Sequence, residues 1–234
     1  MNQPEKPSTS ETNKAPIVPW TVGDTWTGLF LFVLLIASLL VIAIVWRGAS
    51  FLQSVGLVVS ELLYLTPVLY ILAKRRISLS TLGFRSFDKN SLALGCGLFV
   101  MAYVLIILHN LILTLAGVTT QGEMINALLG RLDNPGWLVF VGIVLAPFVE
   151  ETFFRGFLFA GFRQRLGWKK SALFTSAIFA VAHLQLVALI PTFILGYLLA
   201  YIFHRSNSLW PGIILHFTVN SMAFGLIFVL SQVQ

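Results

Sequence analysis

The chain has 234 residues, of which 57% are hydrophobic and only 10% are charged. Soluble domains carry about 25% charged residues, so this composition excludes an ordinary soluble domain and predicts an all-α, polytopic transmembrane bundle. The net charge of +6 does not indicate nucleic-acid binding, because the basic residues gather in short loops between apolar runs.

Residues 1–26 are polar, contain several Pro, Ser, Thr and Asn residues, and carry charges of both signs. Such a segment cannot bury an apolar face, so we predict a disordered tail. No basic stretch followed by a small-residue cleavage site precedes Thr27, so the first apolar run is expected to be retained as a membrane span. Residues 27–234 are then predicted to form one helical membrane domain.

Seven apolar segments follow the tail, and most approach the roughly 20 residues that a helix needs to cross the hydrocarbon core. They are residues 27–46, 53–73, 91–117, 136–162, 171–189, 191–203 and 209–230. The sixth segment is short for a span, and little turn signal beyond Pro191 separates it from the fifth. We predict about seven spans enclosing an intramembrane cavity.

Lysine and arginine are distributed unevenly between the loops. The loops after the second, fourth and sixth segments carry Lys74, Arg75, Arg76, Arg85, Lys89, Arg163, Arg165, Lys169, Lys170 and Arg205. The loops on the opposite side carry only Arg47 and Arg131. Because cytoplasmic loops are enriched in these residues, the N-terminus is predicted to be cytoplasmic. The compact size and short loops are typical of a prokaryotic chain, so the expected location is the bacterial plasma membrane.

The fourth segment contains two adjacent carboxylates within an otherwise apolar run. Such groups cost several kcal/mol in hydrocarbon and usually mark a functional site. Glu151 and Arg155 are four residues apart, so they share a helix face and can neutralise each other. Glu150 points about 100° away and gains no such partner from its own helix. Pro147 weakens the helical hydrogen-bond ladder close to this acid.

Partners for Glu150 are offered by later segments, which carry His183, His216 and Asn220. Glu150 and His183 each lie thirteen residues from a basic loop residue, or about 20 Å along an ideal helix. His216 lies at most about 17 Å from its nearest basic loop residue. The three side chains are therefore expected at similar depth. Phe179 precedes His183 by four residues, which places its ring beside the imidazole.

Two kinds of chemistry fit this set of residues. Glu150 and His183 converging on a water would form a general-base pair for hydrolysis, with His216 and Asn220 as oxyanion donors. Alternatively, Glu150, His183 and His216 could hold a divalent metal such as zinc. A proton-coupled transporter is a further alternative, although the segments lack the paired interruptions of many carriers. Glu61, in the second segment, has no assigned partner. Three roles are open for its side chain: it lines the same cavity, forms a hydrogen bond, or binds substrate.

Three motifs occur in order on the late segments: Glu150-Glu151-x-x-x-Arg155, Phe179-x-x-x-His183 and His216-x-x-x-Asn220. Together they resemble the CPBP intramembrane proteases, which include the type II CAAX prenyl endopeptidases and the bacteriocin-immunity (Abi) proteins. The resemblance covers about residues 136–223, and Leu82-Gly83-Phe84-Arg85 is also similar to the family.

The resemblance implies an intramembrane endopeptidase whose water is activated by Glu150 and His183. His216 and Asn220 would donate to the oxyanion, with Glu151 and Arg155 in support. It leaves open a metalloprotease or a metal-free, glutamate-dependent mechanism. The implied partners are membrane lipids and a membrane-associated peptide or lipidated protein, with a prenylated CAAX-type peptide as one candidate. A non-catalytic immunity protein that binds a peptide without cutting it is the alternative from the same family.

Overall fold

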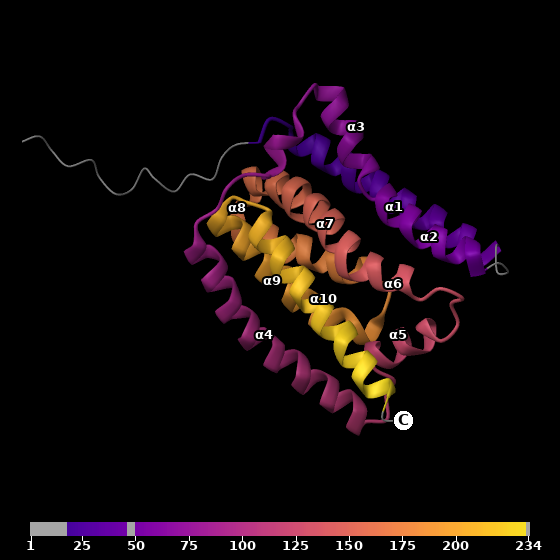
Figure 1. Ribbon diagram of the computed structural model, residues 1–234. Coiled ribbons are helices and arrows are strands. Elements are labelled where there is room, and N and C mark those ends of the chain that lie inside the picture. The colour runs from indigo at the N-terminus through magenta and orange to yellow at the C-terminus, as the bar shows by residue number, and fades with distance from the viewer. Residues whose placement is uncertain (1–17, 46–49, 233–234) are drawn as a thin grey trace, which may run out of the picture.

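The computed structural model describes residues 18–45 and 50–232, and these form an all-α membrane bundle without any β-strand. Its α-helices are α1 Val22–Val45, α2 Ser50–Leu63, α3 Thr66–Arg75, α4 Lys89–Leu115, α5 Gln121–Leu129, α6 Gly136–Phe140, α7 Ala146–Glu150, α8 Ala160–Ala182, α9 Leu189–Ser206 and α10 Trp210–Ser231 (Figure 1). The 3₁₀ turns are η1 Leu79–Leu82 and η4 Leu186–Ala188, and the π-helical turns are η2 Val141–Leu145 and η3 Glu151–Phe159.

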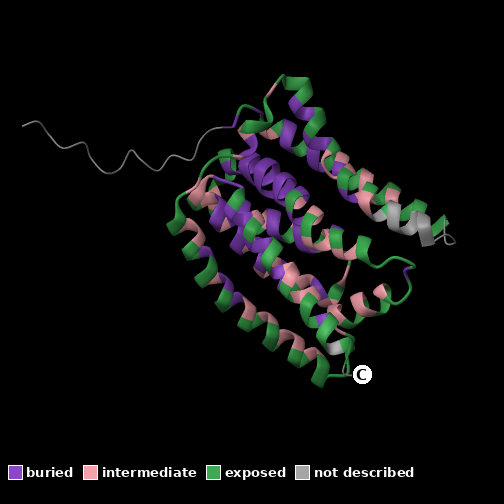
Figure 2. Ribbon diagram, viewed as in Figure 1, coloured by how far each residue is buried: buried purple, intermediate pink, exposed green. Residues whose placement is uncertain are grey.

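Five helical stretches among the described residues are long and apolar enough to cross a membrane. They are Val22–Ile42, Lys89–Leu115, Gly136–Ala182, Leu186–Ser206 and Trp210–Val229. Many large apolar side chains on α1 and α4, such as Phe30 and Ile112, are exposed, as expected where a helix faces lipid. Figure 2 shows the complementary pattern, with buried residues concentrated in the middle of the bundle. The chain is an integral membrane protein.

The longest stretch, Gly136–Ala182, is a helical hairpin that contains the fourth and fifth predicted segments. Gly167 interrupts it with φ 71° and ψ 169°, a conformation that L-residues rarely adopt. The two arms pack against each other, since the ring centroids of Phe162 and Phe174 lie 5.3 Å apart and those of Phe154 and Phe179 lie 4.9 Å apart. The five membrane-length stretches therefore account for six of the seven predicted segments.

The remaining segment, residues 53–73, is divided into α2 and α3 by a turn at Tyr64 and Leu65. Pro67 lies at the first turn of α3 and has no N–H to donate to a preceding carbonyl. Its ring would also clash with a continuous helix at residue 63, so the chain turns here. The second predicted segment therefore consists of two helices rather than one.

The start of the chain also differs from the prediction of a tail through residue 26. Helix α1 begins at Val22, and Trp20 before it is only 1% exposed. The side chain of Asp24 accepts hydrogen bonds from the backbone and hydroxyl of Thr21, which fixes the first turn. Asp24 also forms an ion pair with Arg75 of α3 at 3.0 Å. Residues 1–17, the rest of the predicted tail, lie outside the described residues.

The boundary between the fifth and sixth segments lies earlier than predicted. Helix α8 ends at Ala182, and Leu184 has a positive φ of 55°. Helix α9 then runs from Leu189 to Ser206, so the sixth segment has 18 residues rather than the short run expected. The correction matters for the site, because it places His183 at the C-terminal cap of α8 rather than inside a helix.

Candidate active site

The helix that carries the two carboxylates contains wide turns. The π-helical turns η2 and η3 flank α7, in which Pro147 occupies the first turn. Proline cannot donate to the helical ladder, and π-helical turns are frequent at functional sites. The predicted weakening of this helix beside Glu150 is therefore present in the structure.

Glu151 and Arg155 form the ion pair expected from their spacing. The Nη1 atom of Arg155 lies 2.7 Å from Oε1 of Glu151, and the two side chains are 2% and 1% exposed. Arg155 also donates from Nη2 to the backbone oxygen of Gly196 on α9, at 3.1 Å. Its guanidinium carbon lies 4.4 Å from the centroid of the Phe179 ring, within range of a cation–π contact. The pair thus links the two arms of the hairpin to α9.

His216 of α10 lies between the two carboxylates. Its Nδ1 is 3.2 Å from Oε1 of Glu151, and its Nε2 is 3.7 Å from Oε2 of Glu150. A carboxylate can only accept, so Nδ1 carries the proton of the contact with Glu151. This hydrogen bond turns Nε2 toward Glu150.

The close approach of α10 to Glu151 requires a residue without a side chain. A Cβ atom at Gly212 would lie 2.9 Å from Oε2 of Glu151. Small residues let membrane helices approach closely, and the gain comes from packing and hydrogen bonds rather than from water exclusion. Gly212 therefore sets the distance at which His216, on the same helix, meets the carboxylates.

A cavity of about 280 Å³ brings Glu150 and His183 together. Its lining residues come from the end of α2, from the hairpin and from the connection after α8: Glu61, Tyr64, Glu150, Phe154, Ala182, His183 and Leu184. Two of the four predicted catalytic side chains therefore share one space. His216 borders it through its contact with Glu150.

His183 is oriented by its own helix. Its Nδ1 lies 2.8 Å from the backbone oxygen of Phe179, and a carbonyl can only accept, so Nδ1 is the protonated nitrogen. The other nitrogen, Nε2, then holds the lone pair of the neutral ring. The Phe179 ring lies 4.8 Å from the imidazole at an interplanar angle of 75°. The predicted contact between these two side chains is confirmed.

Asn220 lies one turn beyond His216 on α10, outside the set of residues that line the cavity. Its Nδ2 donates to the backbone oxygen of Gly142, in the π-helical turn η2, at 2.6 Å. The side-chain amide has a second N–H that this contact does not use. The structure thus joins Asn220 to the Glu150 helix, although at a different point from the carboxylates.

The residues do not form a metal site of the expected kind. A metal ion bound by Glu150, His183 and His216 needs all three donors around one point. Within residues 18–45 and 50–232, no group of three or more His, Cys, Asp or Glu side chains is placed to hold one ion. Nδ1 of His216 is committed to Glu151.

Glu61, for which the sequence offered no partner, faces the same cavity as Glu150. Its side chain is 9% exposed, and Oε1 has no hydrogen-bond partner among the residues that the structure describes. Tyr64 also lines the cavity but was not singled out from the sequence. The sequence could have indicated Tyr64, because it follows Glu61 by three residues and residues at that spacing share a helix face.

Part of the chain matches a known protein family. Residues 132–222 match the family model described as "Type II CAAX prenyl endopeptidase Rce1-like". All six predicted site residues lie within that range, whereas Glu61 lies outside it.

Two curated proteins are similar in sequence to this chain, one over 174 residues and the other over 90 residues. The "Putative membrane peptidase YdiL" of Bacillus subtilis (strain 168) is 26% identical over 174 residues, which cover 72% of this chain and 70% of that protein. An "Uncharacterized 24.3 kDa protein" of Escherichia coli is 37% identical over 90 residues, which cover 36% of this chain and 41% of that protein. No solved structure matches the chain.

Proposed function

We propose that this chain hydrolyses a peptide bond in a membrane-associated peptide or protein. The premise is that it belongs, through residues 132–222, to the Rce1-like, CPBP family of intramembrane proteases. The observation that carries the proposal is the shared cavity of Glu150 and His183, with His216 at 3.7 Å from Glu150. A carboxylate and an imidazole on one cavity can take a proton from a single water between them.

In the proposed reaction, a water in the cavity loses a proton to the Glu150–His183 pair. The resulting hydroxide attacks the carbonyl carbon of the scissile peptide bond, and the carbonyl oxygen becomes an oxyanion. The pair then returns the proton to the leaving nitrogen as the C–N bond breaks. One carboxylic acid and one amine are released, the acid then passes its proton to the amine to give a carboxylate and an ammonium group, and Glu150 and His183 regain their starting states.

We assign His216 and Asn220 to the oxyanion. An Nε2–H of His216 and the unused N–H of Asn220 are donors on one face of α10. Donors fixed before the reaction are worth several kcal/mol in measured hydrolases, because they need no reorganisation as charge develops. Glu151 and Arg155 act as positioning residues, since Glu151 holds the tautomer and direction of His216.

The mechanism routes no step through a metal ion, because the donors are not arranged around one point. The substrate is assigned only as a peptide or lipidated protein within reach of the membrane. A prenylated CAAX-type peptide is the candidate that the family description suggests.

The proposal is tested by peptide hydrolysis with purified chain in detergent. A panel of quenched fluorescent peptides, with and without a prenyl group, would be incubated with the wild type, Glu150→Gln and His183→Asn. General bases contribute about 10²- to 10⁴-fold, so each substitution is expected to lower kcat/KM at least about 100-fold. A chelator is expected to leave the wild-type rate unchanged.

Matched controls come from the same residue types outside the cavity. Glu123→Gln changes the same carboxyl in the exposed capping box of α5, where glutamine can still cap. His204→Asn changes a histidine near the end of α9. Both controls should cleave at the wild-type rate. Wild-type rates in Glu150→Gln would refute the site, and binding without cleavage across the panel would instead support a peptide-binding immunity protein.

A further inference from the structure

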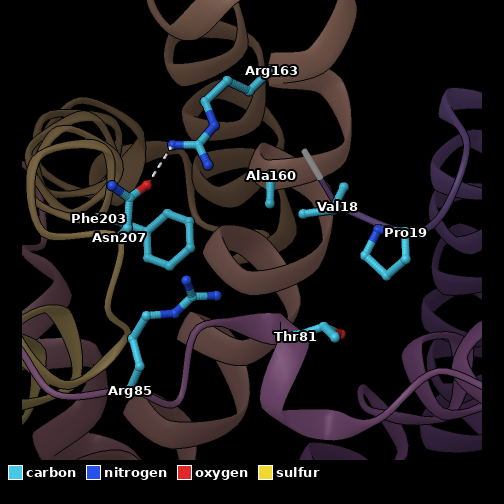
Figure 3. Close-up of a pocket in the computed structure, with 8 residues that line it drawn as sticks. All are labelled: Val18, Pro19, Thr81, Arg85, Ala160, Arg163, Phe203 and Asn207. Atoms are coloured by element: carbon cyan, nitrogen blue, oxygen red, sulfur yellow. Dashed lines mark hydrogen bonds between the residues drawn. The ribbon is translucent and has the colours of Figure 1, made fainter. Parts of the chain in front are cut away.

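A second cavity, of about 120 Å³, lies beside Ala160 and Arg163, at the C-terminal end of the hairpin arm that carries Glu150. It is lined by Val18, Pro19, Thr81, Arg85, Ala160, Arg163, Phe203 and Asn207 (Figure 3). Arg163 follows Glu150 by thirteen residues, so about 20 Å of helix separates the two sites. None of its lining residues belongs to the proposed hydrolytic site.

The cavity holds two guanidinium groups. Figure 3 shows the side chains of Arg85 and Arg163 reaching into it from different elements. Two like charges therefore line the same cavity. The lining includes no Asp or Glu, and the ion pairs of the described residues involve neither arginine.

Arg163 is the buried member of the pair, at 8% exposed. Among the described residues, its one hydrogen bond to a side chain goes from Nη1 to Oδ1 of Asn207, at 3.4 Å. Its guanidinium lies over the rings of Phe159 and Phe203, with 5.3 Å and 5.8 Å to the ring centroids. These neighbours position the group without neutralising it. A buried charge without a counter-charge is costly, and a second cation beside it raises that cost.

The backbone around Arg85 is fixed in place. The hydroxyl of Ser208 donates to the backbone oxygen of Arg85 at 2.6 Å, and the N–H of Leu209 donates to the oxygen of Gly83 at 2.9 Å. These bonds hold the segment after η1 against the turn between α9 and α10. The two arginines are thereby kept near each other by structure outside their own side chains.

The position of the cavity indicates what would neutralise the two cations. It joins the segment before α1, the segment after η1, the end of the first hairpin arm and the turn after α9. Helix ends of a membrane bundle lie at the depth of the lipid headgroups. Guanidinium groups bind phosphate through paired hydrogen bonds, and clusters of basic residues at this depth bind anionic headgroups.

We propose that Arg85 and Arg163 form a binding site for the phosphate group of an anionic phospholipid. The lipid phosphate supplies the negative charge that the lining residues lack, and it links the hairpin to the segment that carries Arg85. The site is independent of the proposed hydrolysis.

The test measures retention of phosphatidylglycerol by native mass spectrometry of the delipidated, full-length chain. Wild type would be titrated with phosphatidylglycerol, with phosphatidylcholine and, separately, with inorganic phosphate. Arg85→Gln removes the exposed arginine and Arg163→Gln the buried one, while Arg165→Gln removes the same charge from an exposed position two residues along the helix. Thermal unfolding would verify that each variant is folded.

We expect one phosphatidylglycerol to be retained in preference to phosphatidylcholine. Its dissociation constant should rise about tenfold in Arg85→Gln and in Arg163→Gln, because each substitution removes a charge-assisted hydrogen bond, and stay unchanged in Arg165→Gln. Equal retention by wild type and Arg85→Gln would overturn the site, even if Arg163→Gln failed to fold. Arginine-dependent binding of inorganic phosphate, without a preference for phosphatidylglycerol, would overturn the lipid as its source.

Discussion

The carboxylate of Glu151 receives hydrogen bonds from two different elements. Arg155 donates from one turn along the same helix, and His216 donates from α10, both to Oε1. A buried ion pair of this kind is weak evidence for stability, because both charges lose their hydration. Its value here is orientation: the Glu151 contact turns Nε2 of His216 toward Glu150.

We predict that Arg155→Met destabilises the chain by about 3–5 kcal/mol, because it leaves the Glu151 charge buried without its main counter-charge. The double variant Glu151→Gln with Arg155→Met should recover most of that loss. The measurement is the free energy of unfolding in detergent for wild type, both single variants and the double variant. A double variant as unstable as Arg155→Met alone would contradict this account.

The carboxyl of Glu61 is buried beside a second carboxyl at Glu150, and one of its oxygens has no hydrogen-bond partner in the described part of the chain. An unsatisfied buried polar group costs about 1–3 kcal/mol, so Glu61→Leu is expected to stabilise the chain by that amount. Glu61→Gln keeps a polar group in the same place and should gain much less. Thermal unfolding midpoints of the three proteins test the prediction, and a lower midpoint for Glu61→Leu would show that the carboxyl makes a stabilising contact.

Sequence spacing predicted the contacts that lie within one helix, whereas for contacts between helices it gave candidates without their geometry. The Glu151–Arg155 pair and the Phe179–His183 contact each follow from a separation of four residues. For Glu150 the sequence offered His183, His216 and Asn220 as partners but could not give their distances, because the spacing between helices is set by packing; His216 lies at 3.7 Å. The shared cavity of Glu61 and Glu150 was left open for the same reason.

Helix α10 depends on Gly212 for its approach to the hairpin. We predict that Gly212→Ala lowers peptidase activity, because its Cβ would meet Oε2 of Glu151 at 2.9 Å and push against a carboxylate that Arg155 and His216 already hold. The readout is kcat/KM in the peptide assay together with the unfolding midpoint.

Gly225 on the same helix is the matched control, because a Cβ there would meet nothing within 4 Å. Gly225→Ala should raise helix stability by about 0.5–1 kcal/mol, as alanine is the better helix former, and leave the rate unchanged. Equal rates for wild type and Gly212→Ala would show that the carboxylates do not depend on this approach.

At the scale of the helices, hydropathy predicted the apolar segments, whereas the breaks were harder to place. The α2–α3 turn was hard to place because the apolar pattern continues through it, and only Pro67 breaks the helix there. The end of α8 at Ala182 has little turn signal, since Leu184 takes its positive φ without being glycine. Both breaks lie beside the cavity, and they place Tyr64 and His183 in its wall. The local rules therefore failed at the candidate site itself.

At the scale of the whole molecule, the loops predicted to be cytoplasmic gather at one end. Val18, Arg85, Arg163 and Asn207 line one cavity although they come from four separate parts of the chain. In Figure 1 the start of α1 lies near α3 and α8, while the end of α10 lies far from them, near α5. This arrangement agrees with an odd number of crossings between the start of α1 and the end of α10.

We predict that the end with the basic loops faces the cytoplasm, because lysine and arginine are retained on that side during insertion. Single cysteines at Asn134 and at Lys170, in a Cys96→Ala background, would be exposed to a membrane-impermeant maleimide in intact bacterial cells. Asn134→Cys lies in the connection before α6 and should be labelled directly, whereas Lys170→Cys, just after the hairpin turn, should be labelled only after lysis. The opposite pattern would invert the orientation, and it would place the paired arginines of the second cavity at the outer leaflet.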